Sequence, residues 1–347
     1  MEEPTASKYQ IAGVDIGKAN EVVKRIGALA LTTFNDRVLK GIGTFGAPYH
    51  LGDLGKDDLV LVSSVDGVGT KLKIAFMADK HDTVGMDLVN HCVNDILTMG
   101  ATPLFFLDYL GVGRLDPDMA EQVILGLREG CRQNKIPLIG GETAEMPGFY
   151  RPGEYDLVGF IVGSVQRERL VDGSKIVQGD RIIGLPSNGL HTNGYSLVRK
   201  ILIEDEKMNL DEPLPGTGAP LFEELLRVHK SYQRSVAPLL AMDTLHGMAH
   251  ITGGGLLENV PRILPGMVNA RIDTKAWKPQ VIFTFLQEKG GISRDEMYRV
   301  FNMGLGYLLV VAPSVADDVI RVLEDEGETA IPVGDIVSGN GQVELVS

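Results

Sequence analysis

A row of polar side chains at helical spacing, Asp87, His91, Asn94 and Asp95, is the part of this sequence best suited to chemistry. Apolar residues recur between them every three or four positions, which predicts a helix that ends near Gly100 with the polar side chains on one face. Carboxylate and amide oxygens in such a row can bind a hard cation such as Mg²⁺. The same pattern is typical of an ordinary solvated helix face, so both interpretations stay open.

A second polar segment follows a predicted buried strand at 59–65 and reads Asp66-Gly67-Val68-Gly69-Thr70-Lys71. The glycines allow backbone N–H groups to approach phosphate oxygens, Asp66 offers an oxygen ligand for magnesium, and Lys71 supplies positive charge. The segment therefore predicts a phosphate and metal site at the end of the strand. Asp-Gly pairs also mark ordinary turns, so the spacing alone is a moderate signal.

Two glycine-rich loops in the second half of the chain, at 187–194 and 250–255, each precede a predicted helix. Free N–H groups and the helix dipole suit such positions to anions. His191 and His250 lie in these loops, and a neutral imidazole can contact an amide or transfer a proton near neutral pH. A buried structural histidine is the alternative for each ring, and a plain tight turn is equally consistent with the second loop.

The surrounding pattern predicts an α+β protein of two domains. The first domain combines predicted strands at 59–65, 104–112, 136–139 and 156–165 with a helix at 121–134. The polar stretch 167–180 serves as a linker, and a strand at 181–186 restarts the pattern. The predicted domains are residues 1–168 and 169–347.

Two further segments complete the candidates. Gly140-Gly141-Glu142-Thr143 follows the short strand at 136–139 and is interpreted as a turn that offers backbone donors and one carboxylate. Residues 41–55 are rich in glycine, which is consistent with a lid over a nucleotide or with a plain connector.

The formal net charge of −13 argues against a general nucleic-acid or anionic-membrane binder. Cys92 and Cys131 form no CxxC pair and are expected to be reduced, buried thiols. The N-terminal residues lack a signal-peptide pattern, and no run approaches the roughly 18 apolar residues of a membrane helix. We therefore expect a cytoplasmic protein with neither a nucleic-acid nor a membrane partner.

Several motifs in register resemble the aminoimidazole ribonucleotide synthetase family, the phosphoribosylformylglycinamidine cyclo-ligases. The resemblance covers nearly the whole chain in order, which makes it far more specific than any single motif. The matching segments are 12–16, 64–71, 140–148, 187–197, 250–255 and 296–304, together with Asp95, Gly100, Ala101 and Pro103.

The resemblance implies an enzyme that uses ATP to activate the formyl amide oxygen of formylglycinamidine ribonucleotide as an iminophosphate. The amidine nitrogen then closes the imidazole ring, and aminoimidazole ribonucleotide, ADP and phosphate are released. ATP and Mg²⁺ are the implied cofactors, and a need for K⁺ stays open. The implied assembly is a homodimer in which the sheets of two N-terminal ATP-binding domains pair into a barrel, with a sandwich-like C-terminal α/β domain that binds substrate.

The resemblance also implies roles for individual residues. Asp66 and Asp95 are expected to hold magnesium, with Asn94 in support. The catalytic candidates are His191 first, then His250, with Glu142 as an acid in the site. His50, His229 and His246 fall outside the motifs and are expected to be surface or structural residues. The expected nucleotide-binding group is Asp66, Gly67, Gly69, Thr70, Lys71, Asn94, Asp95, Gly140, Gly141 and Thr143.

Related ATP-using enzymes are the main alternatives. Selenophosphate synthetases carry a reactive cysteine or selenocysteine near the N-terminus, but here no cysteine precedes Cys92. The hydrogenase-maturation relative ends in a cysteine, formylglycinamidine synthetase is much longer, and thiamine-phosphate kinases lack the segments at 140–145 and 296–302. A nucleotide-binding protein without turnover is the alternative from another class, against which Asp66, Lys71, Asp95 and His191 argue together.

Overall fold

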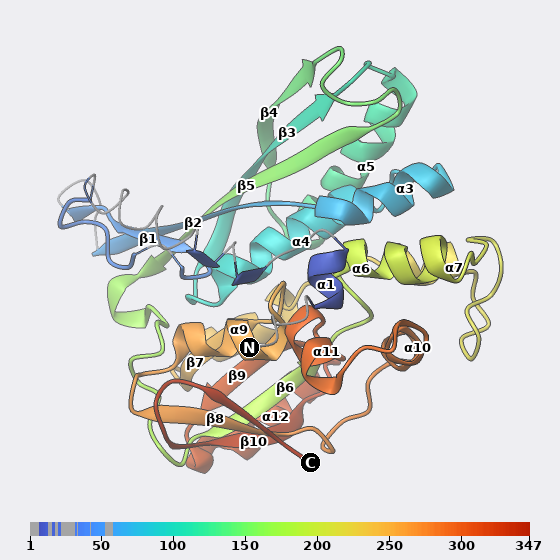
Figure 1. The fold of residues 1–347 in the computed structure, drawn as a ribbon. Coiled ribbons are helices and arrows are strands. Elements are labelled where there is room, and N and C mark those ends of the chain that lie inside the picture. The colour runs from blue at the N-terminus through green and yellow to red at the C-terminus, as the bar shows by residue number, and fades with distance from the viewer. Residues whose placement is uncertain are drawn as a thin grey trace.

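Two mixed sheets, each flanked by helices, lie one above the other in the computed structural model (Figure 1). The structure describes residues 7–12, 16–17, 20–21, 32, 34–41, 43–52 and 58–347. Residues 13–15 of the motif at 12–16 lie outside this set, as do residues 42 and 53–57 of the glycine-rich segment at 41–55. The lid therefore stays a prediction.

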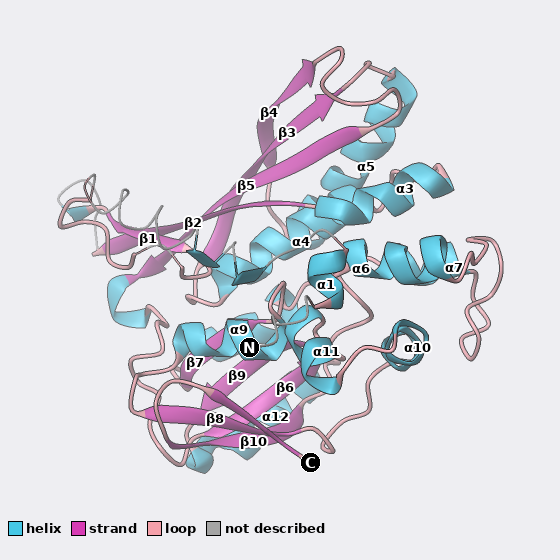
Figure 2. Cartoon of the chain, in the orientation of Figure 1, coloured by secondary structure: helices cyan, strands magenta, loops and turns pink. Residues whose placement is uncertain are grey.

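The first sheet has the strand order β1-β2-β5-β3-β4. Helices α4 and α5 pack against each other, and α4 packs on β2, β3 and β5 (Figure 2). The strands are β1 (Ala47–His50), β2 (Leu59–Gly67), β3 (Thr102–Val112), β4 (Leu138–Glu145) and β5 (Tyr155–Gln166). The helices are α3 (Leu72–Ala78), α4 (Val84–Leu97) and α5 (Pro117–Gln133).

Alternate residues of β2 and β5 are buried under α4, as the two-residue period of a strand requires. The opposite face of this sheet keeps apolar side chains at the surface, since Val65 is 59% and Phe160 is 36% exposed. These two residues are paired across β2 and β5. No helix among the described residues buries this pair, so one apolar face of the first sheet is open.

The second sheet has the order β11-β8-β10-β6-β9-β7, and every residue of β9 is buried because helices cover both faces. Its strands are β6 (Arg181–Pro186), β7 (Leu245–His250), β8 (Val268–Asp273), β9 (Leu305–Val311), β10 (Ile331–Ser338) and β11 (Val343–Val346). Its helices are α6 (Tyr195–Arg199), α7 (Leu221–Leu225), α8 (Gln233–Leu240), α9 (Gly255–Asn259), α10 (Val281–Gly290), α11 (Arg294–Val300) and α12 (Ala316–Asp325).

Most predicted elements are confirmed, and the strand at 181–186 matches β6 at both ends. The strand predicted at 136–139 is present with different bounds, because β4 runs through 138–145 and pairs in parallel with β3. Pairing with β3 thus overrides the low strand preference of Gly140 and Gly141. The predicted turn at 140–143 is consequently part of an edge strand.

The solvated-face alternative for the helix around Asp87 is also wrong. Every residue of α4 except Met86 is buried, including Asp87, His91, Asn94 and Asp95. The helix ends as predicted, since Gly100 has a left-handed backbone with φ of 74°. Its polar side chains must therefore find partners inside the molecule.

Candidate active site between the two domains

One row of polar side chains on α4, Asp87, Asn90 and Asn94, binds the backbone of the segment 227–232; we call it the clamp row. Asp87 Oδ1 accepts a hydrogen bond from the His229 backbone N–H at 2.7 Å. Asn90 Nδ2 donates to the His229 carbonyl at 2.7 Å. These bonds join the first domain to the chain that precedes α8.

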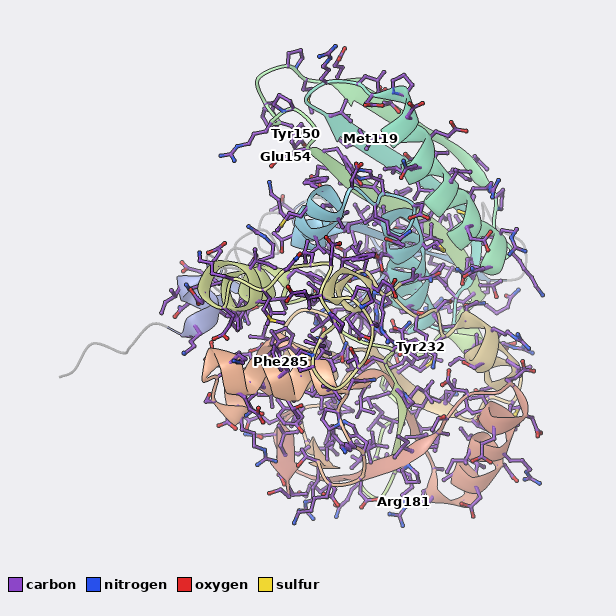
Figure 3. The ribbon with its side chains drawn as sticks, turned by 90° about the vertical axis from the view of Figure 1, so that its right-hand side faces the viewer. Met119, Tyr150, Glu154, Arg181, Tyr232 and Phe285 are labelled. Carbon is purple, nitrogen blue, oxygen red and sulfur yellow. The ribbon has the colours of Figure 1, made fainter. Side chains whose placement is uncertain are left out.

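Asn94 completes the clamp row. Its Nδ2 donates to the Lys230 carbonyl at 2.8 Å, and its Oδ1 accepts from the Tyr232 N–H at 2.9 Å. Tyr232 lies between the two domains in Figure 3. The prediction that Asn94 supports a metal site is therefore wrong, because both ends of its amide bind backbone.

Lys71 also belongs to this junction. Its fully buried Nζ lies 2.7 Å from Asp87 Oδ1 and donates to the Arg227 carbonyl at 2.6 Å. Burial lowers the pKa of Lys71 and raises that of Asp87, while their pairing opposes both shifts. The structure thus places the lysine predicted to bind nucleotide phosphate in an internal ion pair.

The neighbouring residues of α4, His91 and Asp95, form a second row that faces the end of β2; we call it the site row. His91 Nε2 lies 2.7 Å from Asp66 Oδ2 and 3.8 Å from Asp95 Oδ2. Burial acts to lower the pKa of His91, but Asp66 and Asp95 outweigh it and raise that pKa to about 9. Burial likewise acts to raise the pKa of Asp66, but His91 lowers it overall. His91 is therefore a cationic ring that lies between the carboxylates of Asp66 and Asp95.

Asp95 connects this pair to the second domain. Its Oδ1 lies 2.8 Å from His250 Nδ1, and its Oδ2 accepts from the Ser64 hydroxyl at 3.1 Å. Burial lowers the pKa of His250, and Asp95 partly opposes this shift. The structure therefore brings together Asp66, Asp95 and His250, three residues predicted to act in one site.

His229 is buried at the centre of a group of four histidines, which excludes the surface alternative for this residue and leaves the structural one. Its Nε2 lies 2.9 Å from His250 Nε2, and its Nδ1 lies 3.2 Å from Thr192 Oγ1. The Thr192 hydroxyl also lies 2.9 Å from His91 Nδ1. No local motif marks His229, because the clamp row brings it here from a distant part of the chain.

His191 stacks on His229 with ring centroids 4.1 Å apart. Its buried ring nitrogens have no hydrogen-bond partner within the described part of the chain, and burial lowers its pKa well below the usual value. His191 is therefore a neutral ring behind the site row.

A polar cavity of about 350 Å³ opens beside the site row. Its second-domain wall includes Arg262, whose guanidinium lies 4.9 Å from the centre of the Phe45 ring. Burial lowers the pKa of Arg262, although nearby acids oppose this effect. The cavity can therefore present carboxylates and a cation to one ligand. Its lining is Thr44, Phe45, Ser64, Val65, Asp66, His91, Asp95, Asn193, Thr252, Gly253 and Arg262.

Glu142 does not reach this cavity within one chain. Strand register places Glu142 in the row of Tyr109, Val158 and Gly67, whereas Asp66 lies in the adjacent row on the other face of the sheet. Three strand spacings of about 4.8 Å also separate β2 from β4, or roughly 14 Å. Gly140, Gly141, Glu142 and Thr143 are exposed on β4 and lie apart from the cavity of their own chain, so their place in a site stays a prediction.

The remaining predicted residues lie at the end of β2. Gly67 N donates to Asp66 Oδ1 at 2.7 Å, and Gly69 has a left-handed backbone with φ of 70°. Thr70 is exposed, with its hydroxyl 3.1 Å from that of Ser196 in the second domain. Their predicted contact with phosphate stays a prediction.

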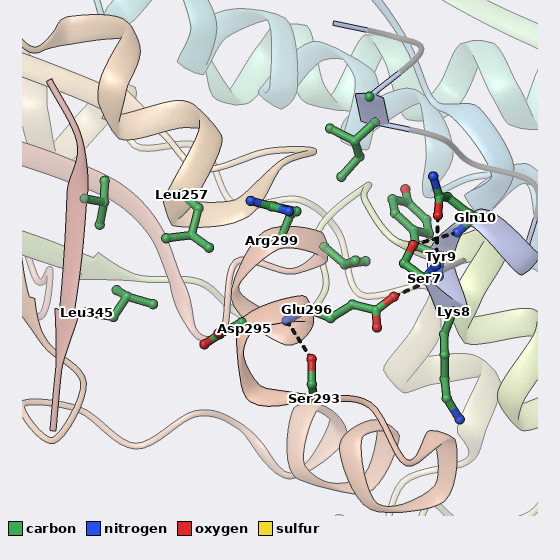
Figure 4. A pocket seen from close by; sticks show the side chains of 14 residues that line it. Ser7, Lys8, Tyr9, Gln10, Leu257, Ser293, Asp295, Glu296, Arg299 and Leu345 are labelled. Carbon is green, nitrogen blue, oxygen red and sulfur yellow. Dashed lines mark hydrogen bonds between the residues drawn. The ribbon is translucent and has the colours of Figure 1, made fainter. Parts of the chain in front are cut away.

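A larger hollow of about 890 Å³ lies between α11, β11 and the short helix α1 (Lys8–Ile11), as Figure 4 shows. The Tyr9 N–H donates to Glu296 Oε1 at 2.9 Å across it, and a Ser7 and Gln10 capping box begins α1. The first residue of the 296–304 motif thus anchors α1 to the second domain.

Comparison with known proteins agrees with this geometry. The model described as "AIR synthase related protein, N-terminal domain" matches residues 47–165, and its C-terminal counterpart matches residues 177–346. A phosphoribosylformylglycinamidine cyclo-ligase of Trichlorobacter lovleyi is 51% identical over 97% of both chains. One from Bacillus thuringiensis is 50% identical over the same shares.

The chain belongs to the phosphoribosylformylglycinamidine cyclo-ligase family.

More distant solved structures share its fold. The hydrogenase maturation protein HypE, in complex with ATP, superposes with a TM-score of 0.61 at 19% identity, covering 82% of this chain and 81% of its own. AaThiL, complexed with AMPPCP and TMP, has a TM-score of 0.63 at 16% identity, with 92% and 91% covered. Within the described residues, no helix is long and apolar enough to span a membrane.

Proposed function

We propose that this ATP-dependent ligase converts formylglycinamidine ribonucleotide into aminoimidazole ribonucleotide, a step of purine biosynthesis, at the cavity between its two domains. The observation that carries this proposal is the meeting of Asp66, Asp95 and His250, from three separate family motifs: the two carboxylates line one polar cavity, and the buried His250 binds Asp95 from behind it. Family membership at about half identity over almost the whole chain supports the reaction. ADP and phosphate are the other products.

ATP is the proposed phosphoryl donor, and HypE in complex with ATP and AaThiL complexed with AMPPCP support this. We place the phosphates against the end of β2, where Gly67, Gly69 and Thr70 offer backbone and hydroxyl donors. Arg262 is a cation of the cavity wall and suits the phosphate of either substrate. Lys71 is left out of the proposed contacts, since its ammonium is fully buried against Asp87.

Magnesium fits the cavity carboxylates. The Asp66 side chain is 40% exposed, Asp95 lies on the same wall, and both offer the hard oxygens that Mg²⁺ prefers. His91, Asp95 and His250 also offer ligand atoms within 4.8 Å of one another, but imidazole nitrogens suit Zn²⁺ better than Mg²⁺. When bound, magnesium would neutralise charge on the phosphoryl group during its transfer.

The residues of the chain would then position the substrate and accept the proton that is released at ring closure. Arg262 and the His91 ring place positive charge beside the oxygen that is phosphorylated. The proton released at ring closure is taken up by Asp95, on the cavity wall, whose hydrogen bond to His250 can share it. His191 packs on His229 and, unlike His250, makes no hydrogen bond to Asp95, so it ranks below His250 as a proton acceptor.

The open apolar face of the first sheet supports a homodimer, because exposed β-sheet faces of this kind are usually covered. Pairing of two such sheets into a barrel would cover Val65 and Phe160 and bring the exposed β4 residues close to a neighbouring chain. The proposed domain boundary lies between residues 168 and 169, and the proposed location is the cytoplasm. Light scattering that gives a stable monomer at micromolar concentration would overturn the dimer.

Turnover by the purified protein tests the function. The assay contains ATP, Mg²⁺ and formylglycinamidine ribonucleotide, and follows aminoimidazole by diazo coupling alongside ADP. We expect one aminoimidazole per ADP. ADP without aminoimidazole would point to a related ATP-using enzyme, and neither product would point to a binder without turnover. Exchange of K⁺ for Na⁺ in the same assay decides whether turnover requires K⁺.

A further inference from the structure

Phe45 places an aromatic hydrocarbon ring on the wall of a largely polar cavity. It comes from the segment before β1, lines the cavity together with Thr44, and is only 8% exposed. The centre of its ring lies 4.9 Å from the guanidinium of Arg262, which belongs to the other domain. The contact between Phe45 and Arg262 therefore joins the two domains at the cavity wall.

The local structure around Phe45 holds its ring in place. The Thr44 hydroxyl donates to the Gly46 carbonyl at 2.7 Å, which closes a short loop around Phe45. A Cβ atom on Gly46 would lie 2.7 Å from Val62 Cγ1, so only glycine lets the chain pass this close to β2. The next residue begins β1, which pairs with β2. Phe45 is thus fixed beside a strand that lines the cavity.

Arg262 depends on this ring for its position. Within the described part of the chain, no hydrogen bond or ion pair holds its guanidinium, and the Phe45 ring packs on it. The Glu258 carboxylate of the same domain pairs instead with Arg299, whose Nε lies 3.5 Å away. The proposed function places the Arg262 cation beside the oxygen that is phosphorylated. The ring that packs on this cation therefore lies next to the activated amide.

The activated amide can react in two ways. In ring closure the amidine nitrogen attacks the formyl carbon, a C–N bond forms, the C–O bond to phosphate breaks, and phosphate leaves. Water that attacks the same carbon forms a C–O bond instead, and its two protons end on the amide nitrogen and on the phosphate. This second reaction returns the unchanged formamide and consumes one ATP. The site must therefore keep water away from that carbon.

We propose that Phe45, held against Arg262, excludes water from the phosphorylated amide and so couples the use of ATP to ring closure. The proposal rests on the proposed function of the cavity. The other residues that line the cavity are mostly polar or charged and would hold water there. The Phe45 ring has no hydrogen-bonding group, so it fills space beside the amide that solvent would otherwise enter.

The ratio of ADP to aminoimidazole tests this role. Phe45→Ala opens the cover, and Phe45→Leu keeps a smaller apolar side chain in case the alanine variant does not fold. We expect the ratio to rise from one in wild type to about three or more in Phe45→Ala, with a smaller rise in Phe45→Leu. Loss of folded protein lowers both products by the same factor, so a merely structural role would leave the ratio unchanged.

Phe285 provides the matched control, because its ring also packs with a cation. It is partly buried on α10, outside the cavity, and Lys289 Nζ lies 5.9 Å from the centre of its ring. Phe285→Ala should keep one aminoimidazole per ADP. Without the amidine substrate, no Phe45 variant should form more ADP than wild type, because water attacks the activated amide rather than ATP.

Turnover of Phe45→Ala in H₂¹⁸O identifies the bond that water makes. Attack at the formyl carbon transfers ¹⁸O into the amidine substrate that is recovered, since phosphate leaves with the original oxygen. Direct hydrolysis of ATP transfers ¹⁸O into phosphate instead. We expect mass spectrometry to show ¹⁸O in the recovered substrate when ATP is present and none when ATP is omitted.

Two results would overturn the proposal while a wild-type ratio of one still supports the proposed function. They are a ratio of one in both Phe45 variants, or ¹⁸O in phosphate alone. A wild-type protein that forms no aminoimidazole would refute the proposed function and this proposal with it.

Discussion

The clamp row and the site row lie on one helix, yet they use their polar atoms differently. Asp87, Asn90 and Asn94 bind backbone N–H and carbonyl groups of 229–232, and Asp87 also pairs with the buried Lys71 ammonium. His91 and Asp95 bind other ionisable side chains and border the cavity. A backbone N–H group can only donate and a carbonyl can only accept. The hydrogen bonds of the clamp row therefore hold the two domains together. Side-chain partners can exchange protons, which is what the chemistry of the site row requires.

This difference teaches that burial and polarity alone do not mark a catalytic residue. Asn94 and Asp95 are adjacent and both buried, with exposures of 0% and 6%. Successive helix residues point about 100° apart, so one faces the 227–232 segment and its neighbour faces the cavity. Substitutions in the clamp row should therefore lower the free energy of unfolding, and substitutions in the site row should lower kcat.

The largest effect on stability is expected from Asp87→Asn. It leaves the buried Lys71 ammonium without its counter-charge, and loss of one partner of a buried ion pair costs about 3–5 kcal/mol. Urea unfolding followed by circular dichroism measures this loss. Asp243→Asn breaks the exposed pair with Lys175 and serves as the control, with little expected change. Equal stability of the two variants would refute the clamp.

Asn94→Ala is expected to have the next largest effect. It leaves the Lys230 carbonyl and the Tyr232 N–H without their partner, which costs about 1–3 kcal/mol for buried groups. Turnover per folded molecule should stay within about twofold of wild type if the residue only docks the domains. A large loss of kcat at unchanged stability would move Asn94 into the site.

The pH dependence of stability should report His91. Its pKa rises from an ordinary 6.5 in the unfolded chain to about 9 in the folded chain. Folding then favours the protonated ring, so the stabilisation is complete below pH 6.5 and is lost as pH rises through about 9. Urea unfolding at several pH values, with chelator present, should show this fall, and His91→Gln should flatten it. Stability that rises with pH over this window would contradict the assignment.

Arg262→Lys is expected to give the smallest effect. The lysine keeps the positive charge on the cavity wall but loses the planar guanidinium that packs on Phe45 and can bind phosphate through two N–H groups. We expect KM for one phosphorylated substrate to rise by a factor of about 5–10, or roughly 1 kcal/mol, with kcat less affected. Initial rates at varied ATP and varied amidine decide which substrate it contacts.

The sequence predicted much of the fold and the centre of the site, but little of what joins them. Periodicity predicts α4 and β6, and family motifs identify Asp66, Asp95 and His250 before the structure brings them together. The contacts of Thr192 with His91 and of His229 with the clamp row were missed because they form only across the domain junction. The spacing of residues along the sequence does not predict such contacts.

The partners of Asn94 and the place of Glu142 on β4 differ from the sequence-based expectation for the same reason. Asn94 was separated from its role by backbone partners far along the chain, at Lys230 and Tyr232. Pairing with β3 continues β4 through the predicted turn, so Glu142 lies on an edge strand about three strand spacings from β2 of its own chain. Both differences concern where a side chain points, which is decided by tertiary pairing.

Asp95→Asn, measured for both kcat and unfolding free energy beside Asn94→Ala, tests the division between the two rows most directly. Asparagine keeps an acceptor for His250 Nδ1 but removes the carboxylate charge and the proton acceptor at the cavity. We predict that kcat falls by roughly 10²- to 10⁴-fold, the usual worth of a general acid or base, while stability stays within about 1 kcal/mol of wild type. Near-normal kcat together with a stability loss as large as that of Asn94→Ala would contradict the account, because Asp95 would then be another docking residue.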